Sequence, residues 1–292
     1  MEGNLIRILF GKLLDVLRFD KPKARFAEVD PEGAWKPVRF RAQCDGNDIR
    51  GRILFPSEHP SKQYPALIIC HGIPGSGAQR PPDDPGYEGL ARRFSSLGLA
   101  TIVFNFRGCG ESEGNFDMMG WTRDLEAVVE TALNTPHIDP TRLIILGFSG
   151  GGAAAIQVAA DNDDVFGLAV VGTPAHFKLF KAEPEQIVAD FRERGLFKDQ
   201  DFPRDVDKWL QGFEEIEPRR WIAHFKGKHF LVVHGDEDEL IPIEHAHDLV
   251  DRAPSGISEL AVIPGGVHRL RLDPRCIKIL EDWLVKILGW QR

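Results

Sequence analysis

A serine inside a glycine-flanked pentad is the residue of this chain best placed for covalent chemistry. The pentad Gly147-Phe-Ser149-Gly-Gly151 follows four apolar residues, 143–146, and precedes a run of small residues. A strand, a sharp turn and a helix in that order expose a serine hydroxyl at a sheet edge, beside helix N–H groups that favour developing negative charge. The pattern indicates a nucleophile elbow with Ser149 as nucleophile. A bare Gly-x-Ser-x-Gly also arises by chance as a glycine-rich turn, so the rest of the chain decides between the two.

Activation of this serine requires a histidine that takes its proton and a carboxylate that orients the histidine. Reactive groups in an open α/β sheet collect in loops beyond the carboxyl ends of the strands. Among the ten histidines, His268 meets this condition, because it ends the loop 264–268 after a predicted strand at 259–263. The acid is expected near position 238, in the loop 235–242 after a predicted strand at 230–234. That loop carries four neighbouring carboxylates: Asp236, Glu237, Asp238 and Glu239.

The resulting chain order of serine, acid and histidine is the one that accompanies a nucleophile elbow. A single histidine in a polar loop would carry little weight, but the joint match in order and sheet edge is hard to obtain by chance. Side-chain reach favours an aspartate over a glutamate and leaves Asp236 and Asp238 open.

Two backbone donors are needed for the oxyanion of a tetrahedral intermediate. One is the N–H of Gly150, directly after the nucleophile. The other is the N–H of Ile73, in the glycine-containing turn 71–76 that follows a predicted strand at 65–70. His71 begins this turn and could pass for a base or a metal ligand. We interpret it as structural, with hydrogen bonds inside its own loop.

Composition and charge are those of an ordinary globular protein. The 292 residues carry a net charge of −8, with 42% hydrophobic and 27% charged residues, which predicts a self-sufficient core and no general attraction to nucleic acid. The four cysteines, at 44, 70, 109 and 276, lack C-x-x-C spacing, so neither a zinc site nor a redox pair is expected. The glycine-rich turn 105–112 lacks a phosphate-loop lysine, so no nucleotide cofactor is expected. Unpaired thiols, an N-terminus without signal-peptide form and the lack of ~18 to 20 consecutive apolar residues favour a cytoplasmic protein without a membrane span.

The remaining pattern predicts an α/β domain. Residues 1–36 are expected to form an amphipathic helix, at about 5–17, and a connector. The simplest interpretation is a helix packed on its own domain, and the alternative is a basic interfacial helix or a homodimer contact. Asp45-Gly-Asn between strands at 38–44 and 49–55 predicts an antiparallel hairpin. Strands then alternate with helices, which predicts a doubly wound, mostly parallel sheet of about eight strands. The expected strands are 65–70, 100–104, 143–146, 167–171, 230–234 and 259–263, and the expected helices are 87–97, 122–133, 150–160, 243–252 and 273–288.

Residues 173–227 interrupt the alternation, because a loop between a helix and a strand usually has ~2 to 6 residues. They contain helical patterns at 184–194 and 206–213 and seven of the nineteen phenylalanines, at 177, 180, 191, 197, 202, 213 and 225. A small helical cap with an apolar inner face explains the enrichment. It would be inserted after the sixth predicted strand, between core segments 37–172 and 228–292, with aromatic side chains lining the substrate pocket. A helical hairpin that fills the core is the alternative.

These motifs, taken in order, resemble those of the α/β-hydrolase superfamily. The matching pieces span residues 38–290: His71-Gly-Ile-Pro-Gly-Ser, Asn105-Phe-Arg-Gly-Cys-Gly-Glu-Ser, Gly147-Phe-Ser-Gly-Gly, His234-Gly-Asp-Glu-Asp-Glu-Leu-Ile-Pro and Gly265-Gly-Val-His. The resemblance implies the α/β-hydrolase fold with a helical cap, no cofactor and no metal. It also implies these site residues: Ser149 as nucleophile, Asp238 as acid, His268 as base, and Ile73 and Gly150 as oxyanion donors.

Within the superfamily, the motifs look most like those of capped carboxylesterases and feruloyl-type esterases. Serine at the elbow differs from the aspartate of haloalkane dehalogenases and epoxide hydrolases. The lack of a propeller-sized N-terminal domain argues against an oligopeptidase. The expected function is hydrolysis of small carboxylic esters through an acyl-enzyme. Hydrolysis of thioesters, amides or carbon–carbon bonds would use the same triad, and a catalytically silent ligand-binding protein is the alternative of another class.

Overall fold

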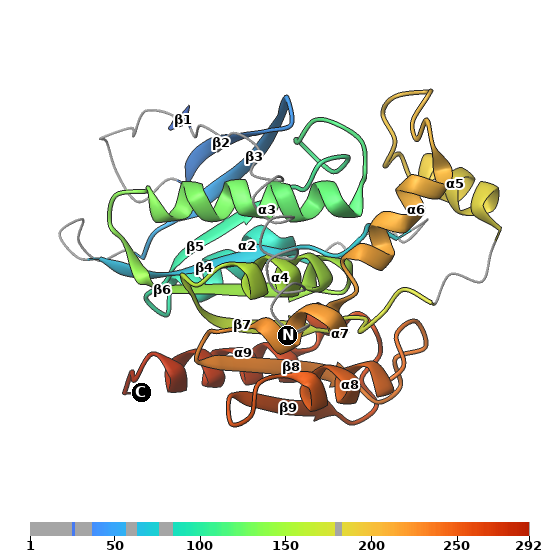
Figure 1. Ribbon diagram of the computed structural model, residues 1–292. Coiled ribbons are helices and arrows are strands. Elements are labelled where there is room, and N and C mark those ends of the chain that lie inside the picture. The colour runs from blue at the N-terminus through green and yellow to red at the C-terminus, as the bar shows by residue number, and fades with distance from the viewer. Residues whose placement is uncertain (1–24, 27–36, 57–62, 76–83, 179–182, 292) are drawn as a thin grey trace, which may run out of the picture.

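One mixed sheet forms the centre of the molecule (Figure 1). The computed structural model describes residues 25–26, 37–56, 63–75, 84–178 and 183–291. The predicted N-terminal helix lies outside these residues. The sheet has the strand order β1-β2-β3-β5-β4-β6-β7-β8-β9. The strands are β1 (Arg25–Phe26), β2 (Val38–Cys44), β3 (Asn47–Leu54), β4 (Tyr64–Cys70), β5 (Ala100–Phe104), β6 (Ile138–Phe148), β7 (Val165–Val171), β8 (His229–Gly235) and β9 (Ser258–Ile263).

The predicted hairpin and the parallel sheet are both confirmed. β2 pairs with β3 in antiparallel register, with Cys44 opposite Asn47. The turn is therefore two residues, Asp45 and Gly46, with φ of 50° and 79°, the left-handed pair that a two-residue hairpin turn requires. β3 joins β5 in antiparallel fashion, and every pair from β5 through β9 is parallel. The buried apolar run of β4 is typical of a strand covered on both faces.

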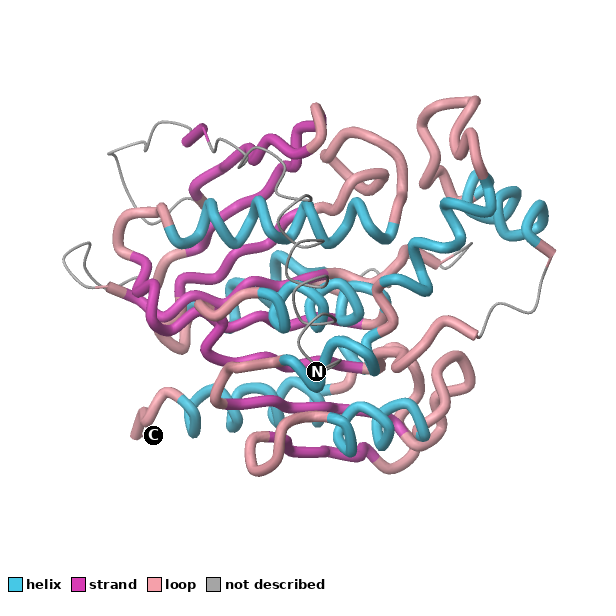
Figure 2. Tube along the Cα trace, in the orientation of Figure 1, coloured by secondary structure: helices cyan, strands magenta, loops and turns pink. Residues whose placement is uncertain are grey.

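Helices cover both faces of this sheet (Figure 2). α3 (Met118–Leu133), α4 (Gly150–Asp161) and α8 (Glu244–Arg252) contribute to one apolar core. α2 (Gly86–Ser95) and α9 (Pro274–Ile287) contribute to a second core on the other face. The result is the α/β-hydrolase fold: eight strands of five or more residues, plus the two-residue β1. Among the helices that the structure describes, none has the length and apolarity of a membrane span.

The segment between β7 and β8 is helical, as its pattern predicts. It contains α5 (Pro184–Glu193), α6 (Val206–Glu215), α7 (Pro218–Trp221) and the 3-10 helix η1 (Ile222–His224). α5 and α6 extend from the body of the molecule beyond the ends of the parallel strands (Figure 1). Their position agrees with a cap, which remains a proposal that we take up below.

The aromatic enrichment of this segment has a different cause from the predicted one. Most of these rings form a cluster with Phe116, whose contacts join α5 and α6 to the loop before α3. Ring centroids lie 4.8 Å apart for Phe116 and Phe191, 5.2 Å for Phe191 and Trp209, and 5.4 Å for Trp209 and Phe213. Such edge-to-face pairs add stability to the buried area of each ring. The phenylalanines therefore anchor the segment, and the expectation that they line the pocket is wrong for all the described ones except Phe191.

Replacing Phe213 by alanine should lower the free energy of unfolding by about 3–5 kcal/mol, because it leaves a cavity in a fully buried cluster. Urea denaturation measures this loss. Leu210→Ala is the matched control on the same helix, since Leu210 is only partly buried and should lose clearly less. Equal losses for the two variants would mean that the cluster does not hold α6 in place.

Candidate active site

Ser149 occupies a strained turn between β6 and α4. Its backbone has φ 50° and ψ −125°, a left-handed conformation that residues other than glycine adopt at a cost. The turn is possible because its neighbours have no side chains. A Cβ at Gly147 would lie 2.4 Å from the Cα of Gly152, and one at Gly151 would lie 2.1 Å from the carbonyl oxygen of His71. The pentad therefore forms the nucleophile elbow that its spacing predicts.

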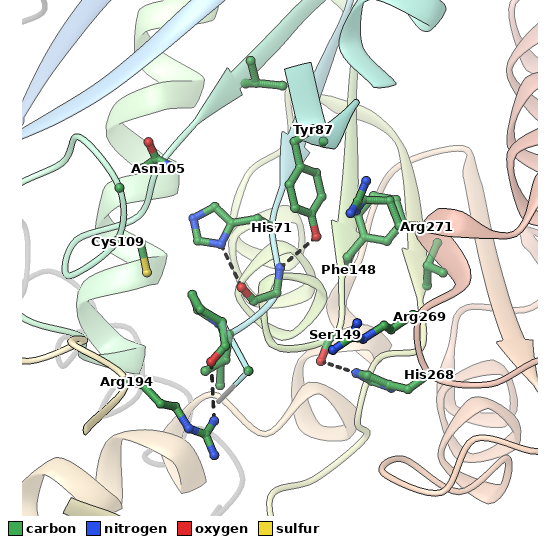
Figure 3. Close-up of a pocket in the computed structure, with 18 of the residues that line it drawn as sticks. His71, Tyr87, Asn105, Cys109, Phe148, Ser149, Arg194, His268, Arg269 and Arg271 are labelled. Carbon is green, nitrogen blue, oxygen red and sulfur yellow. Dashed lines mark hydrogen bonds between the residues drawn. The ribbon is translucent and has the colours of Figure 1, made fainter. Parts of the chain in front are cut away.

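The three side chains chosen from loop position meet at this turn, and Figure 3 shows the contact between Ser149 and His268. The Nε2 atom of His268 is 3.1 Å from the Oγ of Ser149, and its Nδ1 atom is 2.8 Å from Oδ2 of Asp238. Ser149 follows β6, Asp238 follows β8 and His268 follows β9. Parallel strands end at a common edge, so residues 119 and 30 positions apart in the chain come together there.

The carboxylate of Asp238 is buried and fixed by its own loop. Oδ1 accepts hydrogen bonds from the N–H groups of Leu240, at 3.0 Å, and Ile241, at 2.9 Å. Burial raises the pKa of Asp238, but the hydrogen bonds from His268 and Ile241 outweigh burial and hold the pKa below its ordinary value. Asp238 is therefore a carboxylate at neutral pH, with one oxygen aimed at the His268 ring.

The three rival carboxylates do not reach His268. Glu237 and Glu239 are exposed. Asp236 accepts a hydrogen bond from the N–H of Gly265 at 2.6 Å. The sequence suggests that Asp236 would bond to local backbone. Its partner instead lies 29 residues away in the His268 loop, so Asp236 ties the acid loop to the histidine loop.

The sequence does not predict the role of His234, which lies next to Asp238. Its Nε2 donates to the carbonyl of Ile241 at 2.8 Å and lies 3.6 Å from Oδ2 of Asp238. Burial lowers the pKa of His234, so the ring is neutral. A histidine at the end of a buried strand gives no signal in one sequence, because its partner lies in the loop that follows.

Two backbone N–H groups lie beside Ser149 without a partner among the described residues. They belong to Ile73 and Gly150, and a Cβ placed on Gly150 would be 3.7 Å from the nitrogen of Ile73. Two unpaired donors next to a nucleophile are what an oxyanion site requires, and their role as oxyanion donors is part of the proposal made below. His71 stays outside this chemistry: Nδ1 donates to the Gly72 carbonyl at 2.8 Å, and Nε2 accepts from the N–H of Phe106 at 3.1 Å. Both ring nitrogens are used, which supports its structural interpretation and adds a partner outside its loop.

Ser149 and His268 open into a pocket of about 1010 Å³. The loop after β4, the start of α2, α5 and the loop after β9 all contribute to its wall. Tyr87 projects into it beside Phe148, with ring centroids 5.6 Å apart, and accepts a hydrogen bond from the Gly72 N–H (Figure 3). α5 contributes Gln186, Ile187 and Phe191. A substrate at Ser149 would thus touch both the sheet edge and the inserted segment.

Within the described residues, no group of three or more His, Cys, Asp or Glu side chains is placed to hold a metal ion. All four cysteines are free and buried. The glycine-rich turn 105–112 is built around Arg107, whose buried guanidinium pairs with Asp124 at 2.7 Å. A buried ion pair of this kind fixes the turn.

Several known proteins are similar to this chain in sequence or in fold. A monoacylglycerol lipase of Mycolicibacterium smegmatis is 26% identical over 259 residues, covering 76% of this chain and 88% of the lipase. Acetyl xylan esterase 1 from Thermoanaerobacterium sp. superposes with a TM-score of 0.67 at 16% identity, covering 96% of this chain and 93% of that one. Est1E from Butyrivibrio proteoclasticus superposes with a TM-score of 0.63 at 19% identity, covering 86% and 99%.

The sequence model of the prolyl oligopeptidase family matches residues 89–290. The prediction that the chain is unrelated to oligopeptidases, which was based on the lack of a propeller-sized N-terminal domain, is therefore wrong. The match covers most of the chain and includes the pentad, the acid loop and the histidine loop. The chain is therefore an esterase-like α/β-hydrolase, and it belongs to the prolyl oligopeptidase family.

Proposed function

We propose that this protein is a serine hydrolase that cleaves carboxylic esters through a covalent acyl-enzyme. The observation that carries the proposal is the continuous hydrogen-bonded chain from Ser149 through His268 to Asp238 at the edge of the pocket. A chain of this kind converts a weak serine nucleophile into a reactive one. The lipase and esterase named above make an ester the favoured substrate.

In the proposed reaction, Ser149 Oγ attacks the ester carbonyl while His268 Nε2 accepts the hydroxyl proton. The oxyanion that forms accepts hydrogen bonds from the N–H groups of Ile73 and Gly150. His268 then returns the proton to the departing alcohol, which leaves an acyl group on Ser149. Water, deprotonated by the same nitrogen, attacks the acyl carbonyl and releases the acid. Asp238 stabilises the imidazolium in both halves of the reaction.

We infer further that residues 173–227 act as a cap. Ile187 and Phe191 on α5 line the same pocket as His268. Their helix is held by the aromatic cluster around Phe116. A cap in this position would contact the part of the substrate remote from the reacting bond. The choice among ester chains would then depend on α5, with the strands supplying the chemistry.

Amides and peptides are the second candidate substrates, because the chain belongs to a family named for an oligopeptidase. The same triad would serve, and only the leaving group differs. Thioesters and carbon–carbon bonds remain further alternatives with the same residues. A catalytically silent binding protein would need the triad geometry without its reactivity.

Labelling with a fluorophosphonate, followed by peptide mapping, tests the proposal. The expected result is a single adduct on Ser149, because only that serine is hydrogen-bonded to an activated histidine in the described structure. A panel of chromogenic esters, thioesters and aminoacyl amides then ranks the leaving groups, and the esters should show the highest kcat/KM. Failure of the label to attach would favour the silent binding protein, and faster amide cleavage would favour a peptidase.

A further inference from the structure

We infer that the preferred substrate carries an anionic group, a carboxylate or a phosphate, close to the bond that is cleaved, and that Arg269 binds it. This inference rests on the proposed function and names its substrate class. Arg269 directly follows His268 and lines the same pocket as Ser149. Figure 3 shows its side chain on the His268 side of the pocket, pointing toward Ser149.

The charges of the pocket wall single out Arg269. The other charged side chains that line it are held in ion pairs: Arg50 with Asp48, Arg52 with Glu111, Glu88 with Arg92, Asp190 with Arg194, and Asp84 with Arg271. The Arg269 guanidinium has no hydrogen bond or ion pair to any residue that the structure describes. Among the described side chains of this wall, one positive charge therefore has no carboxylate partner.

The neighbouring arginine is occupied in a way that makes the contrast clear. Arg271 donates to both carboxylate oxygens of Asp84 and lies over the Tyr87 ring, with Cζ 4.9 Å from the ring centroid. It is neutralised and fixed, so it shapes the wall. Arg269 is exposed, and its planar group can form two parallel hydrogen bonds to a carboxylate or phosphate that enters the pocket.

The position of Arg269 also limits where the anion can be. The Arg269 side chain points toward Ser149 in the pocket that both residues line (Figure 3). A substrate anion bound by Arg269 would therefore be near the ester carbonyl, on either the acyl or the alcohol portion. The protein as a whole carries a net charge of −8, so general electrostatic attraction would not favour such a substrate. A local cation is needed.

Two matched pairs of esters test the inference. The first pair differs only in the acyl portion, a free glutarate monoester against its methyl ester, with 4-nitrophenol as leaving group. The second differs only in the alcohol portion, an acetate ester of 4-hydroxybenzoate against that of its methyl ester. The wild-type protein should prefer the anionic member of at least one pair, and the pair that responds identifies the portion that carries the charge.

In Arg269→Gln, the ratio of kcat/KM for anionic over neutral ester should fall about tenfold for that pair, because a charge-assisted hydrogen bond is lost. Arg269→Lys should keep part of the preference, and Arg252→Gln, which removes a positive charge from the surface of α8, should keep all of it. Both members of a pair use the same triad, so general damage to the enzyme cancels in the ratio. Raising the ionic strength should weaken the wild-type preference.

Two results would count against the inference, and they differ from each other. If the wild type hydrolyses the esters but Arg269→Gln leaves both ratios unchanged, Arg269 does not bind the substrate and the proposed function stands. If the wild type hydrolyses neither pair and Ser149 resists the fluorophosphonate, the proposed function fails and this inference fails with it.

Discussion

Replacing Ser149 by alanine is expected to lower ester turnover by about 10⁴- to 10⁶-fold, the range found when a triad member is removed from other serine hydrolases. The substitution removes only the hydroxyl group, whose one hydrogen bond in the described structure is to His268. Turnover of a 4-nitrophenyl ester measures the loss. The residual rate reports what the oxyanion donors and substrate binding contribute without a nucleophile.

The fold should survive this substitution. The Cβ of Ser149 packs so closely on Gly72 that a Cβ there would lie only 3.0 Å away. Alanine keeps this Cβ, so the packing between the two loops is unchanged. The strained backbone at φ 50° is also the same for serine and alanine. The free energy of unfolding should therefore stay within about 0.5 kcal/mol of the wild type, the usual range for a substitution that removes no packing.

Ser96→Ala is a suitable control, because Ser96 is exposed at the end of α2 and its hydroxyl donates only to the Arg93 carbonyl. Its turnover should equal that of the wild type. If Ser149→Ala retained wild-type turnover with an intact fold, Ser149 would not be the nucleophile. The activity would then have to reside outside the site described here.

The parts of this site that a single sequence predicts are those with strict local requirements. The elbow needs small residues where Gly147 and Gly151 stand, and the structure shows backbone within 3 Å of both positions. The loop after β4 needs a small residue where it passes Ser149, and a Cβ on Gly72 would lie 3.0 Å from the Ser149 Cβ. The parallel arrangement of the strands follows from their alternation with helices, because a right-handed crossover brings each new strand in parallel to the one before it.

Contacts between distant loops could not be predicted from the sequence. The hydrogen bond from the Gly265 N–H to Asp236 depends on how two loops pack against each other, and the bond between His234 and Ile241 depends on how the loop after β8 folds back on its own strand. The phenylalanines of 173–227 show the same limit: their number indicates an apolar contact, but only the fold reveals that most of the described ones belong to the cluster around Phe116. Ion pairing cannot be predicted from the sequence either, so Arg269 and Arg271 look alike there, although among the described residues only Arg271 has a carboxylate partner.

Asp238→Asn is expected to lower turnover by about 10⁴-fold while Ser149 and His268 stay in place. The amide can still accept the Leu240 and Ile241 N–H bonds at Oδ1, so the loop keeps its form. At the position of Oδ2, an NH₂ group would face His268 Nδ1 at 2.8 Å. A donor there favours the tautomer with the proton on Nε2, which cannot take the serine proton, and leaves no negative charge to stabilise the imidazolium. The fluorophosphonate should then react with Ser149 far more slowly.

Asp236→Asn is the matched control, because it makes the same chemical change two residues earlier. Its Oδ1 can still accept the Gly265 N–H, so the link between the two loops should persist and turnover should fall far less than in Asp238→Asn. Asp236→Ala removes that link and should raise KM or lower kcat modestly by loosening the His268 loop. Turnover of all three variants at one pH decides the assignment. If Asp236→Asn were the inactive variant and Asp238→Asn the active one, the acid would be Asp236, and the loop in solution would have to differ from the arrangement that places Asp238 against His268.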